Sequence, residues 1–176
     1  MKKIILLALV VGLVGCSNSE TEKLTRQHLK DPESAKFQNI KGYCGEVNAK
    51  NSYGGYTGFK PFYLANGIPV FQDADEKISF SFERGWFAHC ESDSKLSNPE
   101  RTSCAAYSDF AASVVGNKLV GGSPSALIQV VKDNEDADIY IKTINEVFAD
   151  KRINNEEKYA SQILKKCLDG KMKVPL

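Results

Sequence analysis

The chain has 176 residues, of which 42% are hydrophobic and 26% are charged, and its 23 basic side chains nearly balance its 22 acidic ones. This balance excludes the basic surface of a nucleic-acid-binding protein, and the apolar content excludes a disordered polyelectrolyte. The totals disclose no specific biochemical activity. The sequence is most informative about where the protein is located and about its disulfide bonds.

The first residues have the pattern of an export signal. Lys2 and Lys3 precede an apolar run from Ile4 to Val14. These 11 residues would form a helix of about 16 Å, well short of the roughly 30 Å of a hydrocarbon core. We therefore expect a cleaved signal peptide over residues 1–15 and no permanent membrane span.

The motif Leu13-Val14-Gly15-Cys16 resembles the lipobox of bacterial lipoproteins. The resemblance covers residues 1–16 and implies cleavage before Cys16, which would carry diacylglycerol on its sulfur and an acyl chain such as palmitate on its nitrogen. Ser17, in place of Asp, is similar to lipoproteins that are sent to the outer membrane. The implied location is the cell envelope, with the outer membrane favoured over the inner one. The alternative is an ordinary secretory signal with an incidental cysteine.

The remaining cysteines are Cys44, Cys90, Cys104 and Cys167. An even number in an exported chain predicts two disulfides, for which three pairings are possible. The segments described below favour Cys44 with Cys90 and Cys104 with Cys167, and each bridge would stabilise the fold by roughly 4 kcal/mol at most. A metal site is the competing interpretation, but no cysteine pair has zinc-knuckle spacing.

The first half of the mature chain is predicted to be a β-rich module over residues 21–90. Residues 16–20 are expected to form a short lipidated tether, and Thr21 to Lys30 a brief helix that ends before Pro32. Antiparallel strands are indicated where apolar and polar residues intersperse or alternate, and Gly54-Gly55 provides a turn before a returning strand over 56–62. The apolar residues concerned are Phe37, Ile40, Tyr43 and Val47, and then Ile78, Phe80 and Phe82.

The second half is predicted to be a helical module over residues 104–170, after a linker over 91–103 and before a tail over 171–176. Apolar stripes at helical spacing begin at Cys104, after Ser123-Pro124, at Tyr140 and after an Asn154 cap. Cys104 opens the first stripe and Cys167 closes the last, so their bridge would close an antiparallel bundle. The predicted fold class is α+β, with a disulfide-clipped antiparallel β-rich module followed by a disulfide-clipped helical bundle.

Residues 24–63 carry a second resemblance. The phrases Asp31-Pro32-Glu33-Ser34-Ala35-Lys36-Phe37 and Cys44-Gly45-Glu46-Val47-Asn48-Ala49-Lys50-Asn51, followed by Gly54-Gly55-Tyr56-Thr57-Gly58-Phe59, resemble a motif pair of small exported bacterial and phage proteins. That resemblance implies a small β-containing module and no reaction, cofactor or ligand. The later half is more loosely similar to cysteine-clipped helical envelope proteins, which include periplasmic immunity proteins.

Catalytic and metal-binding patterns are weak. His28 lies in the short predicted helix, His89 adjoins Cys90, and the sequence contains no Gly-x-Ser-x-Gly elbow. The acidic run over 133–138 lacks the glycine and final glutamate of a calcium loop. We therefore predict no catalytic residues, no metal and no cofactor, and a hydrolase is the least favoured function.

Aromatic residues cluster around the glycine turn, and some of them are expected to project outward from a short or edge hairpin. The candidate contact surface is Tyr53, Gly54, Gly55 and Tyr56, with Tyr53 the best placed for exposure. Packing of these aromatics in the core is the alternative. The predicted function is a non-catalytic binding protein of the inhibitor, immunity or exclusion type, with the membrane and an envelope protein as partners and no nucleic acid. The alternative is a structural or accessory subunit of an envelope assembly.

Overall fold

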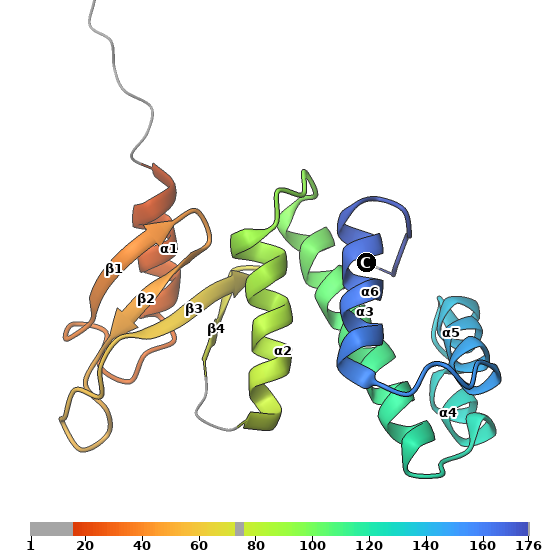
Figure 1. The fold of residues 1–176 in the computed structure, drawn as a ribbon. Helices are drawn as coiled ribbons and strands as arrows, with labels where there is room; N and C mark the ends of the chain where they lie inside the picture. Colours follow the sequence, from red (N-terminus) through yellow and green to blue (C-terminus); the bar gives the residue numbers. More distant parts are fainter. Residues whose placement is uncertain (1–15, 73–75, 176) are drawn as a thin grey trace, which may run out of the picture.

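The structure is a computed structural model that describes residues 16–72 and 76–175 (Figure 1). Helix α1 (Cys16–Arg26) is followed by strands β1 (Lys36–Lys41), β2 (Cys44–Asn48), β3 (Lys60–Ala65) and β4 (Ile68–Phe71). The helices that follow are α2 (Glu76–Trp86), the π-helical turn η1 (Phe87–Glu91), α3 (Asn98–Leu119), α4 (Pro124–Val131), α5 (Ala137–Ala149) and α6 (Glu156–Leu168). The predicted α+β class is confirmed. The expected signal peptide over 1–15 lies outside the described residues.

The four strands form an antiparallel meander in the order β1-β2-β3-β4. Neighbouring residues of β3 face opposite sides of this sheet: Phe62 packs in a cluster with Val47, and Tyr63 packs in another with Cys44. Strand β3 therefore contributes to an apolar cluster on each face of the sheet. In the parts of the chain that the structure describes, no helix has the length and apolar character needed to cross a membrane.

The strand predicted from Ile78, Phe80 and Phe82 is wrong, because these residues lie in helix α2. The helix places Phe82, Gly85 and the downstream His89 at intervals of three and four residues, where all three meet Tyr63. The ring centroids of Phe82 and His89 lie 5.4 and 5.1 Å from that of Tyr63. A Cβ on Gly85 would lie 1.9 Å from the Tyr63 hydroxyl, so only glycine permits this approach.

Several predicted boundaries also differ. Residues 16–20 are not a separate tether but the first part of α1, which ends at Arg26 instead of Lys30. The linker over 91–103 is shorter than predicted, because Ser97 and Glu100 form a capping box that begins α3 at Asn98. The returning strand starts at Lys60 rather than at residue 56. Asn155, whose side chain accepts from the Lys158 N–H, caps α6 in place of Asn154.

Both predicted disulfide pairings are confirmed. Cys44–Cys90 joins β2 to η1 with 5.8 Å between Cα atoms, and Cys104–Cys167 joins α3 to α6 with 5.6 Å. The second bridge lies inside a buried cluster with Leu164. The second bridge therefore crosslinks two helices that also pack against each other, whereas the first ties β2 to η1, which packs against the neighbouring strand β3.

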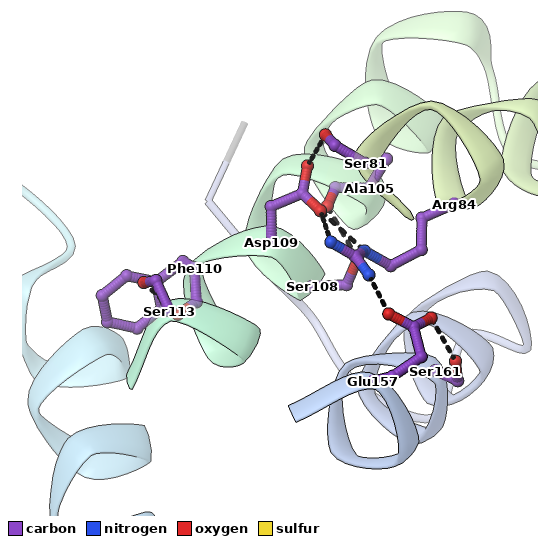
Figure 2. A network of polar contacts seen from close by, with 9 residues as sticks. All are labelled: Ser81, Arg84, Ala105, Ser108, Asp109, Phe110, Ser113, Glu157 and Ser161. Atoms are coloured by element: carbon purple, nitrogen blue, oxygen red, sulfur yellow. Dashed lines mark hydrogen bonds and ion pairs between the residues drawn. The ribbon is translucent and has the colours of Figure 1, made fainter. Parts of the chain in front are cut away.

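A buried arginine connects α2 with two helices of the second half (Figure 2). Arg84 is 8% exposed, and its Nε donates to Asp109 of α3 at 2.6 Å while Nη1 donates to Glu157 of α6 at 2.7 Å. Ser81 also donates to Asp109, at 2.7 Å. This charged network thus connects the predicted β-rich module with the predicted helical module, on either side of the 91–103 linker.

Candidate contact surface

The predicted contact residues lie in the connection between β2 and β3, which we call the tyrosine loop (residues 49–59). In Figure 1 this loop projects at the lower end of the sheet, whereas the first turn of α1 lies at the upper end. Two hydrogen bonds agree with this view. The Thr21 hydroxyl of α1 donates to the Gly42 carbonyl in the β1–β2 turn, and the Lys30 ammonium, beyond the end of α1, donates to the Ser52 hydroxyl in the loop. The tyrosine loop and Cys16 are therefore at opposite ends of the sheet.

The tip of the tyrosine loop is closed by hydrogen bonds centred on Asn51. The Asn51 N–H donates to the Gly55 carbonyl and the Asn51 carbonyl accepts from the Gly54 N–H, both at 2.9 Å. The Asn51 side-chain oxygen accepts from the N–H groups of Tyr53 and Gly55 at 2.9 and 3.1 Å. Gly54 has a φ of 78°, a value that favours glycine. These contacts hold the loop in one turn.

Tyr53 and Tyr56 differ in their surroundings. Tyr53 is 96% exposed, in agreement with the prediction that it projects outward, whereas Tyr56 is 44% exposed. The Tyr56 hydroxyl donates to the Ser34 carbonyl at 3.2 Å, and the ammonium groups of Lys36 and Lys50 lie 5.0 and 5.9 Å from its ring centroid. Tyr56 thus helps to anchor the loop, and Tyr53 presents a free ring at its tip.

The segment after α1 supports the loop from the side. Ser34 accepts the Lys50 N–H through its hydroxyl at 2.9 Å, and the same hydroxyl donates to the Asp31 carbonyl at 2.9 Å. Lys30 donates to the Ser52 hydroxyl at 2.8 Å. Sequence reasoning missed these supporting residues, although the Asp31-Pro32 turn is the signal that brings Ser34 into place.

A hollow of about 400 Å³ lies beside the tyrosine loop, and we call it the lysine groove. Its floor includes Leu29, Val47 and Phe71, which belong to the apolar cluster under the sheet. Its described edges carry Lys30, Lys50 and Lys60, together with His28, and none of its described lining residues is acidic. The three lysines are exposed and form no ion pair among the described residues. The groove therefore combines an apolar floor with uncompensated positive charge.

The other candidate residues from the sequence do not join this surface, apart from His28. Cys16 is the first residue of α1, and its lipidation stays a prediction. His89 is 8% exposed and packs between Tyr63, Asn98 and Thr102, so it is separated from His28. Among residues 16–72 and 76–175, no group of three or more His, Cys, Asp or Glu side chains could hold a metal ion.

A larger hollow of about 890 Å³ lies between α3, α5, α6 and the tail. Its floor holds Tyr107, whose hydroxyl lies 2.8 Å from that of Thr143, and Tyr159, whose pKa is raised to about 12 mainly by burial. Its rim mixes lysines such as Lys166 with the carboxylates of Glu146 and Asp150. Because both signs of charge line this hollow, its charge favours neither anions nor cations. The described lining of the lysine groove, in contrast, carries only positive charge.

Comparison of the chain with protein-family models, with curated proteins and with solved structures gave no match. The tyrosine loop and the lysine groove beside it are the features of the molecule that bear on its function.

Proposed function

We propose that the protein is a lipoprotein of the bacterial cell envelope that binds another envelope protein without catalysing a reaction. Acylated Cys16 would hold it on the outer membrane, and the tyrosine loop would make the contact. The specific role that we favour is that of an inhibitor, immunity or exclusion protein.

The exposure of Tyr53 on a closed loop carries this proposal. Tyrosine and tryptophan are enriched in the energetic centres of protein interfaces, and a loop that is ordered before binding loses little entropy on association. The Tyr53 ring is 96% exposed, while four hydrogen bonds to Asn51 fix the turn that bears it. The Tyr53 ring is thus exposed on a turn that hydrogen bonds hold in shape, and it is available for a contact.

The position of the loop supports the proposal as well. Helix α1 has 11 residues, so its two ends are about 16 Å apart, and the tyrosine loop packs on the segment that follows the far end. If Cys16 is held at the bilayer, the loop lies on the side of the sheet that is remote from it. A partner in the periplasm or at the cell surface could then reach Tyr53.

The anchor is tested with Cys16→Ala. The wild-type protein should be labelled by palmitate and should sediment with membranes, since several acyl chains together hold a protein persistently. The Cys16→Ala variant should lack the label and remain unprocessed or misdirected. Recovery of the wild type mainly in the soluble periplasm would contradict the anchor.

The contact is tested by crosslinking in intact cells, followed by capture of the tagged full-length protein. Tyr53→Ala should reduce the captured partner strongly. Tyr43→Ala is the matched control, because Tyr43 is 52% exposed but lies in the β1–β2 turn at the other end of the sheet. A soluble toxin or enzyme as partner would favour inhibition, and a large membrane assembly would favour the accessory-subunit alternative.

A further inference from the structure

We infer that the lysine groove receives an extended, acidic segment of the partner protein that carries at least one apolar side chain. The inference rests on the proposed function and adds the chemistry of the partner to it. Three properties of the groove carry it: the sign of its charge, its apolar floor and its place beside the tyrosine loop.

The charge of the groove is not neutralised within the described chain. The Lys30 ammonium donates to the neutral Ser52 hydroxyl, and that of Lys50 lies over the Tyr56 ring. The exposed Lys60 forms no ion pair among the described residues. Lys60 pairs directly with Val47 across β2 and β3, so its side chain emerges on the same face as the apolar floor. Carboxylates above this floor would meet the ammonium groups of the lysines that line the groove.

The apolar floor distinguishes a peptide from a simple anion. Val47 is 4% exposed, while Leu29 and Phe71 are partly buried and border the hollow. A volume of about 400 Å³ accommodates a short stretch of chain, with room for one or two large side chains. Alternating side chains of an extended segment would point toward the floor and toward the lysines.

Other polyanions fit the molecule less well. The whole chain has a formal net charge of +1, so it lacks the broad basic footprint that nucleic-acid binding requires. An anionic bilayer would have to reach the lysines at the end of the sheet remote from Cys16. An acidic protein segment is the occupant that matches both the local charge and the position.

The inference is tested with labelled peptides and the full-length protein in non-ionic detergent. The three probes are acetylated eight-residue peptides that alternate Glu with Leu, Glu with Ser or Lys with Leu. The Glu-Leu peptide should bind about tenfold more tightly than either of the other two, and added salt should weaken it. Equal binding of the Lys-Leu peptide would overturn the role of charge, and equal binding of the Glu-Ser peptide would overturn the role of the floor.

Variants then assign the binding to the groove. The double variant Lys30→Gln/Lys60→Gln should weaken the Glu-Leu peptide about fivefold, and Lys60→Gln alone should weaken it less. The matched control Lys132→Gln/Lys158→Gln removes two exposed lysines outside the groove and should leave affinity unchanged. Equal effects of the two double variants would overturn the inference, as would displacement of the peptide by phosphatidylglycerol vesicles.

The peptide-binding result can be distinguished from the result of the test of the proposed function. Tyr53 does not line the groove, so Tyr53→Ala should keep the Glu-Leu peptide while losing the crosslinked partner. Loss of the partner with no preference for the Glu-Leu peptide would leave the contact function standing and reject the acidic segment.

Discussion

The imidazole ring of His89 stacks on the phenol ring of Tyr63, with 5.1 Å between ring centroids and 14° between ring planes. Two side chains of α3 approach the imidazole nitrogens: Asn98 Nδ2 lies 3.3 Å from Nδ1, and Thr102 Oγ1 lies 3.4 Å from Nε2. Asn98 Oδ1 accepts from the Asn66 N–H, so the asparagine can only donate to the histidine. His89 is therefore neutral with its proton on Nε2, and it links β3, η1 and α3.

This arrangement predicts a loss of stability in acid. Burial, and secondly the charge of Arg101, lower the pKa of His89 to about 4. An unfolded histidine titrates near 6.5, so the contribution is complete above that pH and declines as the pH falls toward 4. Between pH 7 and pH 4.5 the free energy of unfolding should fall by about 2 kcal/mol from this residue. Urea unfolding at both pH values, for wild type and His89→Gln, measures it.

His89→Gln provides the internal control, because glutamine does not titrate while carboxylates titrate alike in both proteins. The difference in unfolding free energy between wild type and variant should therefore shrink on acidification. A difference that is independent of pH would contradict the buried, neutral state of His89.

Arg84→Met should lower the free energy of unfolding by about 3 kcal/mol, because it leaves Asp109 and Glu157 without their shared buried partner. The side chains of Asp109 and Glu157 are 34% and 39% exposed, so water can solvate them in part, which limits the loss of stability. Arg84→Lys should recover only part of the loss, since an ammonium group cannot reproduce the fork of donors. Chemical denaturation is the measurement, and a full recovery with lysine would contradict the geometry in Figure 2.

Lys118→Met should destabilise the connection between α5 and α6. The Lys118 ammonium donates to the carbonyls of Val147, Asp150 and Ile153 at 2.8, 2.8 and 2.9 Å. Removal of these charge-assisted hydrogen bonds should cost about 2 kcal/mol of unfolding free energy. Lys132→Met, at an exposed lysine, is the control and should change stability by less than about 0.5 kcal/mol.

Replacement of both Cys104 and Cys167 by alanine should lower stability by at most about 4 kcal/mol, since the bridge closes a loop with a sequence separation of 63. The Arg84 network joins α2 to α3 and α6. Hydrogen exchange should therefore accelerate in α2 as well as in the two helices that the bridge joins. Unchanged protection of α2 would show that the two halves fold independently.

The helical half could be predicted well because its signals are local. Ser123 precedes Pro124 at the start of α4, and Gly170 follows α6 with a φ of 69°. Helix α2 was missed because alternation over five residues fits a strand, and the stripe of Phe82, Gly85 and His89 becomes meaningful only with Tyr63 opposite. The Asn66-Gly67 turn, with both φ values positive, is a local signal that would have located the β3–β4 hairpin.

The candidate surface was predictable in part. The exposure of Tyr53 follows from its place before a glycine turn, a relationship within a few residues. The lysine groove could not be predicted in this way, because Lys30, Lys50 and Lys60 come from separate segments. Only the paired strands and the turn after α1 bring their charges together.

Under the proposed function, Tyr53 contacts a partner without stabilising the fold. The most direct test is the dissociation constant for the partner that crosslinking identifies. It is measured by titrating that purified partner with wild type, Tyr53→Ala and Tyr43→Ala. Tyr53→Ala should weaken binding by about 2 kcal/mol or more, or roughly thirtyfold, while its thermal midpoint stays at the wild-type value and Tyr43→Ala behaves as wild type. Full affinity of Tyr53→Ala, or unfolding of that variant, would contradict the claim.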